Sequence, residues 1–239
     1  MDIIRERAKQ AVQNESSLMV FPEDAFSCPE PLTEKYIEGV QSIAKEYKIH
    51  IIFPLLRKPS DENQKEKNTL NFISNNGELL NTYLKNHLVP VVEEPFTERG
   101  DGKTPVIEAD GVKYTYLICA DYTSNKYAYN GREADIFINP SYDWQAFQYF
   151  TSYGVQARAI ECGFSVLRNP VNGNIILYDI YGRPLHMANV MNVHTGMIYL
   201  DIPKQGRQTI YGATGNWFPW ICLIYSAFAV ISGFVLRKK

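Results

Sequence analysis

The strongest constraint on the fold comes from the end of the chain, where residues 217–236 contain no charged side chain. A run of about 20 mostly apolar residues is long enough to cross the hydrocarbon core of a bilayer as one helix. Three aromatic residues (Trp217, Trp220 and Tyr225) lie towards its start, as is common at a membrane interface, and a basic tail follows at 237–239. We therefore expect a transmembrane helix at 217–236, rather than the buried last helix of a soluble domain.

Charge along the chain predicts how this helix would be oriented. Because lysine and arginine favour the cytoplasmic side, the tail at 237–239 is expected in the cytoplasm and residues 1–216 on the opposite side. Residues 1–17, however, are charged and polar and lack the apolar segment of a secretory signal. Export of the domain would need a further upstream region. The alternative is a tail-anchored protein whose domain stays in the cytoplasm, and the residues alone leave both arrangements open.

Residues 1–216 alternate short apolar runs with amphipathic segments, and they suffice for one α/β domain. Asn75-Asn76-Gly77, between two apolar runs, is a strong hairpin signal. Strands that alternate with helices, together with hairpins, predict a mixed α/β sandwich. The expected helices are 2–13, 33–47 and 144–162; the expected strands are 17–22, 50–55, 70–74, 79–84, 113–118, 135–139, 164–168, 174–179 and 197–202; and the expected loops are 57–68 and 94–103, with a turn at 181–184.

Composition argues against several classes of function. The net charge of −2 and the pI near 6.1 give no electrostatic reason to expect nucleic acid as a partner. The four cysteines and four histidines lack metal-site spacing, and no phosphate-binding or dinucleotide-binding glycine motif is present, so we expect neither a metal nor a cofactor. The remaining candidates are interpreted structurally: Cys28, Cys162 and Cys222 as packing residues, and Trp144, Phe147 and Phe150 as core residues.

Three β-like runs each end with a reactive side chain. LMVFPE ends at Glu23, LLNTYLK ends at Lys85, and YTYLICAD holds Cys119. Taken singly, each has a structural explanation: a surface carboxylate, a lysine at a sheet edge, and a buried thiol. Together they could form an acyl-transfer centre. The thiolate would attack, the carboxylate would take its proton, and the ammonium would stabilise negative charge on the attacked carbonyl oxygen.

The sequence contexts of these residues resemble a known family. FPEDAF, YLKNHLVPVVEE and LICAD, in this order, are similar to the three catalytic motifs of the nitrilase, or carbon–nitrogen hydrolase, superfamily. The resemblance extends over most of residues 17–218 and includes INPSYDW and RNPVNGNIILYDIYGRPL. It implies an α-β-β-α sandwich, in which Glu23 is the general base, Lys85 stabilises the oxyanion and Cys119 is the nucleophile.

Within the superfamily, the chain resembles the apolipoprotein N-acyltransferase family. The KNHLVP run, the TGNWFPW segment and the apolar helix after it carry this resemblance. It implies that Glu93 is important for activity and that Asp121 is a supporting acid, shortened from the usual glutamate. Ala120 stands where these enzymes usually carry an aromatic residue beside the nucleophile, which bears on substrate placement.

The resemblance implies an N-acyltransferase of the bacterial inner membrane, with its catalytic domain on the periplasmic side. It would move a fatty acyl group from a phospholipid donor to the N-terminal amine of a lipoprotein acceptor through a thioester on Cys119. The alternative is a membrane-tethered amidase, in which water replaces the amine, and a third class is an inactive domain that only binds a partner. The family's multi-helix membrane region and first sheet strand are missing upstream, so we expect a fragment or half of a split protein.

Overall fold

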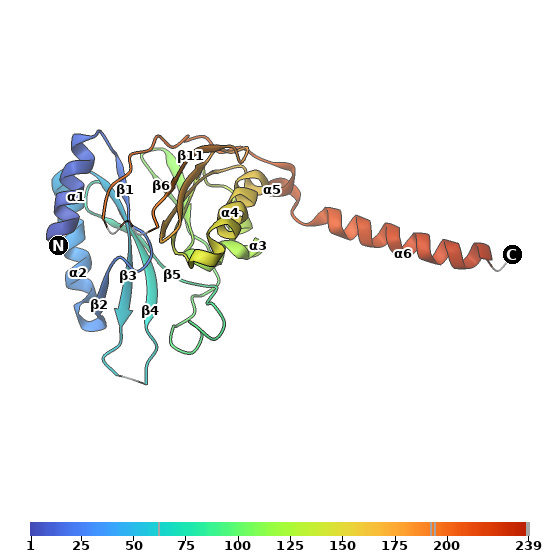
Figure 1. Cartoon of the computed structure of the whole chain (residues 1–239), viewed down its shortest axis with the longest axis horizontal. Coiled ribbons are helices and arrows are strands. Elements are labelled where there is room, and N and C mark those ends of the chain that lie inside the picture. Colours follow the sequence, from blue (N-terminus) through green and yellow to red (C-terminus); the bar gives the residue numbers. More distant parts are fainter. Residues whose placement is uncertain (62, 192, 194, 238–239) are drawn as a thin grey trace.

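The computed structural model describes residues 1–61, 63–191, 193 and 195–237, and the domain has four layers (Figure 1). Two helices cover the outer face of one β-sheet, a second sheet packs on the inner face of the first, and further helices cover the second sheet. This arrangement is the α-β-β-α sandwich predicted from the sequence.

The first helical layer and the first sheet come from residues 2–84. Their elements are α1 (Asp2–Gln13), β1 (Leu18–Val20), β2 (Ser27–Pro29), the 3₁₀ helix η1 (Glu30–Leu32), α2 (Thr33–Tyr47), β3 (His50–Lys58), β4 (Lys67–Ile73) and β5 (Leu79–Leu84). α2 buries Ile37, Val40 and Ile43 at helical spacing, and it ends where Lys48 adopts a left-handed backbone conformation. β1 and β2 pair in parallel with β3, whereas β3, β4 and β5 are antiparallel, with the predicted hairpin between β4 and β5.

The second sheet and its helices follow. Their elements are β6 (Val106–Ala109), β7 (Val112–Tyr116), the 3₁₀ helix η2 (Cys119–Thr123), α3 (Asn125–Asn130), β8 (Ile136–Tyr142), the 3₁₀ helix η3 (Gln145–Phe147), α4 (Gln148–Cys162), β9 (Ser165–Val171), β10 (Asn174–Tyr178), β11 (Pro184–Asn189) and α5 (Ile210–Thr214). The strand order is β11-β10-β9-β8-β7-β6. Because β7, β8 and β9 are parallel, their carboxyl ends meet at one edge of the sheet.

Packing between the sheets fixes their relative position. Phe72 of β4 meets Tyr114 and Tyr116 of β7 edge to face, with ring centroids 5.5 Å and 6.1 Å apart. Ile52 of β3 and Ile138 of β8 are fully buried in the same cluster. This core brings the segments after β1, β5, β7 and β8 to one region of the molecule.

Several sequence predictions are wrong. Residues 197–202 form no strand, and β10 instead pairs with β11, because the Asp179 carboxylate accepts hydrogen bonds from Tyr181 N–H and Arg183 N–H and tightens the turn. β2, β6 and β11 are not predicted from the sequence. The predicted core residues Trp144, Phe147 and Phe150 are 49%, 49% and 70% exposed. Cys222 is exposed as well, whereas Cys28 and Cys162 are buried as expected.

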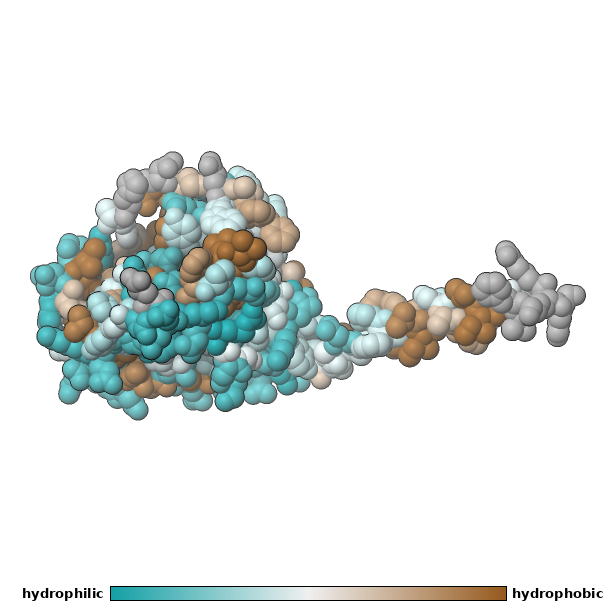
Figure 2. Space-filling model, turned by 90° about the horizontal axis from the view of Figure 1, so that it is seen from below, coloured by the Kyte–Doolittle hydropathy of each residue, from teal (hydrophilic) through white to brown (hydrophobic). Residues whose placement is uncertain are grey.

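The final helix, α6 (Trp217–Arg237), projects away from the domain (Figures 1 and 2). Apolar side chains that include Phe218, Trp220 and Phe228 are more than half exposed. Across the described residues, none of the helices combines the length and the apolar character needed to cross a membrane, so the predicted span at 217–236 is not confirmed. Of the predicted tail, residues 238 and 239 lie outside the described residues.

Candidate active site

Glu23 and Lys85 form a buried ion pair. Lys85, directly after β5, is 1% exposed, and its Nζ donates a hydrogen bond to Glu23 Oε1 at 2.9 Å. The same carboxylate oxygen accepts a hydrogen bond from Asn68 Nδ2 of β4 at 2.8 Å. An ammonium and a carboxylate are buried at low cost only when each finds such partners. The structure therefore brings together two of the three residues singled out in the sequence.

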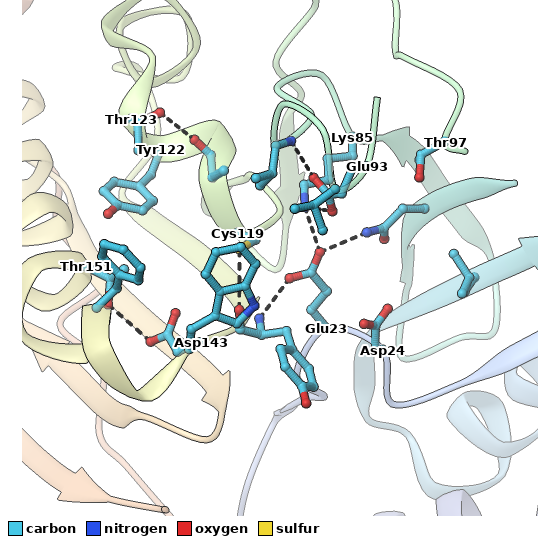
Figure 3. A pocket seen from close by; sticks show the side chains of 18 of the residues that line it. Glu23, Asp24, Lys85, Glu93, Thr97, Cys119, Tyr122, Thr123, Asp143 and Thr151 are labelled. Carbon is cyan, nitrogen blue, oxygen red and sulfur yellow. Dashed lines mark hydrogen bonds and ion pairs between the residues drawn. The ribbon is translucent and has the colours of Figure 1, made fainter. Parts of the chain in front are cut away.

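Cys119 is connected to this pair through the backbone of one residue, Tyr142, at the end of β8. The Cys119 thiol lies 3.8 Å from the carbonyl oxygen of Tyr142, and Tyr142 N–H donates to Glu23 Oε2 at 2.8 Å. Cys119, Glu23 and Lys85 all line one cavity (Figure 3). The thiol, the carboxylate and the ammonium predicted to act together thus face a common space.

The backbone at Cys119 is strained. Its φ of +44° lies in the left-handed region, which a residue with a Cβ adopts at a cost of roughly 1–3 kcal/mol. The strain turns the chain sharply from β7 into η2, so the thiol stands at the sheet edge rather than within the strand. A sequence that places cysteine after an apolar run gives no sign of this conformation.

Asp121 ties the Cys119 turn to the segment that carries Lys85. Its carboxylate accepts hydrogen bonds from Ile118 N–H at 3.0 Å, Asn86 N–H at 3.1 Å and the Tyr83 hydroxyl at 2.7 Å. Burial raises the pKa of Asp121 to about 6, and hydrogen bonds from His87 N–H, the Tyr83 hydroxyl and Ile118 N–H oppose the rise. The predicted supporting acid therefore holds two chain segments together and is fully buried beneath the site.

Glu93 is the second carboxylate partner of Lys85. Lys85 Nζ donates to Glu93 Oε1 at 2.5 Å, and Glu93 Oε2 accepts from Val89 N–H at 2.7 Å. Burial alone would lower the pKa of Lys85, but Glu23, Cys119 and Glu93 outweigh it and raise that pKa above the ordinary value. Lys85 is therefore a permanent cation at neutral pH, shared between two carboxylates.

The same surroundings disfavour a resting thiolate. Burial raises the pKa of Cys119 to about 12, with Glu23 acting in the same direction and Lys85 and Arg168 opposing it. Cys119 therefore rests as a thiol and needs a base to become a nucleophile. Glu23 and Cys119 both contact the backbone of Tyr142, Glu23 at the N–H and Cys119 at the carbonyl oxygen.

The cavity has a volume of about 660 Å³, which is ample for a drug-sized ligand. One side is polar and carries Asp24 and Glu66, while the other carries Trp144, Phe147 and Phe150. These three aromatic residues face the cavity because β8 ends beside it, not because they fill the core. Burial, then the neighbouring Glu23, raises the pKa of Asp24 to about 6. Within the described part of the chain, no three metal-ligating side chains lie together as a metal site would require.

Several residues of the site escape the sequence analysis. Asn68, Asn139, Asp143 and Arg168 all contact the predicted trio or its supporting segments. Asn139 and Asp143 fall within INPSYDW, a segment noted only for its resemblance. Tyr142 acts through its backbone, for which no side-chain signal exists.

Comparisons with known proteins agree with this geometry. A family model described as carbon-nitrogen hydrolase matches residues 1–214. The chain is similar to an apolipoprotein N-acyltransferase of Brucella melitensis, with 27% identity over 72% of this chain and 36% of that protein. It is similar to another from Shewanella oneidensis, with 24% identity over 100% of this chain and 50% of that protein. A shorter match, 31% identical over 47% of this chain and 29% of the other, is to a β-ureidopropionase of Arabidopsis thaliana.

Solved structures share the fold. An amidase from Nesterenkonia sp. AN1, in a form with acrylamide added to its active-site cysteine, superposes with a TM-score of 0.70. The superposition covers 80% of this chain and 82% of the amidase at 17% sequence identity. The chain spans half or less of the length of the curated relatives described above.

Proposed function

This chain belongs to the carbon–nitrogen hydrolase family, and from that premise we propose that it is an N-acyltransferase that works through a thioester on Cys119. The observation that carries the proposal is the buried Glu23–Lys85 pair at the wall of a large cavity, in which Glu23 and Cys119 both contact the backbone of Tyr142. The proposed donor is a phospholipid and the proposed acceptor is the N-terminal amine of a lipoprotein. The two acyltransferase relatives support this choice of substrates.

The first half-reaction forms the thioester. Glu23 takes the proton of the Cys119 thiol, and the sulfur attacks the carbonyl carbon of the acyl ester. Lys85 Nζ and the N–H of Ala120 stabilise the negative oxygen of the tetrahedral intermediate. The carbon–oxygen bond then breaks, Glu23 returns the proton to the departing oxygen, and a lysophospholipid leaves.

The second half-reaction consumes the thioester. The acceptor amine attacks the thioester carbonyl, Glu23 takes a proton from the nitrogen, and the same donors stabilise the oxyanion. The carbon–sulfur bond breaks, and Cys119 recovers its proton from Glu23. Glu93 takes part in neither bond change and keeps Lys85 in place throughout. Because one covalent intermediate separates two products, the kinetics should be ping-pong.

The aromatic side of the cavity supports a fatty acyl group rather than a small amide as the substrate. Trp144, Phe147 and Phe150 are about half exposed or more, and an acyl chain lying against them would remove apolar surface from water. We further propose that the exposed apolar helix α6 keeps the domain at a membrane. The location that the resemblance implies is the bacterial inner membrane, with the domain on its outer side.

A membrane-tethered amidase is the second candidate. It is favoured by the fold shared with the Nesterenkonia amidase and by the similarity to β-ureidopropionase. The same thiol, base and cation would serve both reactions, because each forms a thioester on Cys119, from an ester in the acyltransferase and from an amide in the amidase, and the thioester is then attacked by an amine or by water. The choice therefore depends on which group reaches the intermediate.

Mass spectrometry of the intact protein separates these candidates. The full chain in detergent is incubated with phospholipid, and we expect an acyl adduct that hydroxylamine removes. Cys119→Ala should abolish the adduct, whereas the matched control Cys222→Ser, on the exposed face of α6, should keep it. Turnover of small amides without any adduct from phospholipid would overturn the acyltransferase and favour the amidase. The absence of both reactions would indicate a domain without catalysis.

A further inference from the structure

Arg168 is the largest side chain in the domain that is fully buried, and it lies beside the site without a role in the proposed chemistry. It comes from β9, and its guanidinium lines the same cavity as Cys119. Burying a guanidinium is costly unless its donors are paired, and removing one partner of such a pair is costlier still. The identity of its partners therefore indicates what the charge is for.

The two partners of Arg168 lie at either end of residues 139–143, which are the second half of β8 and the residue after it. Nη1 donates to Asn139 Oδ1, and Nη2 donates to Asp143 Oδ1. The planar fork of an arginine can hold two such acceptors in a fixed relation, which a lysine cannot do. Arg168 thus contacts both ends of residues 139–143 through one guanidinium group.

Residues 139–143 contact both the proposed nucleophile and the proposed base. Asn139 Nδ2 donates to the carbonyl oxygens of Leu117 at 2.7 Å and Cys119 at 3.3 Å, on both sides of the strained turn. Tyr142, between the two arginine contacts, donates its N–H to Glu23 and offers its carbonyl oxygen to the Cys119 thiol. A displacement of the segment would therefore move the base and the nucleophile at once.

Asp143, the carboxylate partner of Arg168, is held in place as well. Asp143 Oδ2 accepts from Thr151 Oγ1 of α4 at 3.1 Å, and Asp143 N–H donates to the carbonyl oxygen of Val171 at 2.9 Å. The guanidinium carbon lies 5.2 Å from the centroid of the Tyr122 ring in η2. These contacts leave the guanidinium little freedom to move, so it acts as a rigid link between β9, β8 and α4.

We propose that Arg168 is a positioning residue for the acyl-transfer centre, holding the Tyr142 peptide and the Cys119 turn in register through Asn139 and Asp143. The proposal rests on the proposed role of Cys119 as the nucleophile.

A second consequence follows from charge. Cys119 faces Glu23 after β1, Lys85 after β5 and Arg168 in β9, with Glu93 behind Lys85 and Asp143 and Tyr122 around Arg168. Of these groups, Lys85 and Arg168 are the cations that favour the thiolate.

Alkylation of Cys119 by iodoacetamide tests the link without any assumption about the substrate. The full chain carries Cys222→Ser, and the modified Cys119 peptide is quantified by mass spectrometry from pH 6 to 10. The double variant Arg168→Gln/Asp143→Asn removes the cation together with its carboxylate partner, so no buried charge is left alone. Arg168 is one of the cations that lower the pKa of the Cys119 thiol, so we expect alkylation at a given pH to be slower in the double variant than in the wild type.

Arg168→Lys keeps the positive charge but removes the planar guanidinium that holds two acceptors. It also provides a test if the double variant does not fold. It should restore the wild-type dependence of alkylation on pH. Formation of the acyl adduct, by contrast, should slow by about tenfold or more, because misplacement of reacting groups by about 1 Å can cost a hundredfold. The matched control is Arg158→Lys on α4, a mostly buried arginine paired with Glu161, which should change neither rate.

The outcomes are distinguishable. Folded variants of Arg168 that keep both the wild-type alkylation profile and the wild-type rate of adduct formation would overturn the inference. In a different outcome, the wild-type protein forms no acyl adduct, but alkylation is slower in the double variant than in the wild type. That result would overturn the proposed acyltransferase and leave the positioning role of Arg168 standing.

Discussion

Replacing Glu93 by glutamine removes one of the two negative charges that share the Lys85 ammonium. Glutamine has nearly the same shape, and its carbonyl oxygen can still accept a hydrogen bond, so the contact with Val89 N–H can survive. The contact between Lys85 Nζ and Glu93 Oε1 loses its charge. The whole charge of the lysine then acts on Glu23, and the ammonium is drawn towards that carboxylate and away from the oxyanion that it would stabilise.

The size of the effect follows from the environment of the pair. Lys85 is 1% exposed and the Glu93 side chain is 20% exposed, so solvent screens the interaction only in part. A hydrogen bond to a charged group contributes about 1.5–3 kcal/mol. At about 1.4 kcal/mol for each tenfold change, its loss corresponds to a rate reduction of roughly 10- to 150-fold if the interaction is fully used in the transition state. We expect the rate to change more than KM, because the contact that is lost is the one between Glu93 and the Lys85 ammonium.

Single-turnover formation of the acyl adduct, followed by mass spectrometry of the intact protein, measures this rate directly. The matched control is Glu94→Gln, one residue along the chain, where the carboxylate is exposed and pairs with Arg99 at the surface. That variant should keep the wild-type rate, since exposed ion pairs contribute little. A folded Glu93→Gln variant with the full wild-type rate would refute the argument that Lys85 must be shared.

Three further predictions follow from the same structure. Glu23→Gln should slow adduct formation by about a hundredfold or more, because the thiol then lacks its base; adduct formation at the wild-type rate would contradict this. In the resting protein, alkylation of Cys119 should rise about tenfold per pH unit from pH 7 to 10, because its thiol has a pKa of about 12 and the thiolate fraction grows with pH; a plateau below pH 9 would show that the thiolate already forms at neutral pH. Gly163→Ala should lower the melting temperature clearly more than Gly111→Ala: both glycines have positive φ, but an added Cβ would lie 2.1 Å from Arg207 O at Gly163 and meets nothing within 4 Å at Gly111. Equal shifts, by differential scanning fluorimetry, would rule out that clash.

The sequence predicts the parts of the fold that depend on side-chain periodicity. α2 is expected at 33–47 and lies there, since Ile37, Val40 and Ile43 recur on one face. The hairpin between β4 and β5 is equally predictable, because Gly77 supplies the positive φ that its turn requires. The edge strands β6 and β11 have weak periodicity and are defined by their pairing with β7 and β10, which no local pattern reveals.

The candidate site follows the same division. The roles of Glu23, Lys85 and Cys119 stay predictions that rest on residue type and order, and those of Glu93 and Asp121 rest on the family resemblance. Tyr142 is not predicted, because it contributes a peptide N–H and a carbonyl oxygen that every residue possesses. Trp144 and its neighbours are assigned to the core because apolar side chains usually lie there, and only the end of β8 beside the cavity places them elsewhere.

The choice between acyl transfer and hydrolysis then becomes a question about the cavity rather than about the reacting groups. A thioester on Cys119 is open to whatever nucleophile reaches it, and water is always present at high concentration. The aromatic residues Trp144, Phe147 and Phe150 are exposed without a ligand, whereas a long acyl chain lying along them would cover that side and exclude water from it. A short acyl group would leave the same side open. The length of the acyl chain would therefore decide how long the thioester survives before water attacks it. An amine acceptor could receive the acyl group only when that lifetime is long.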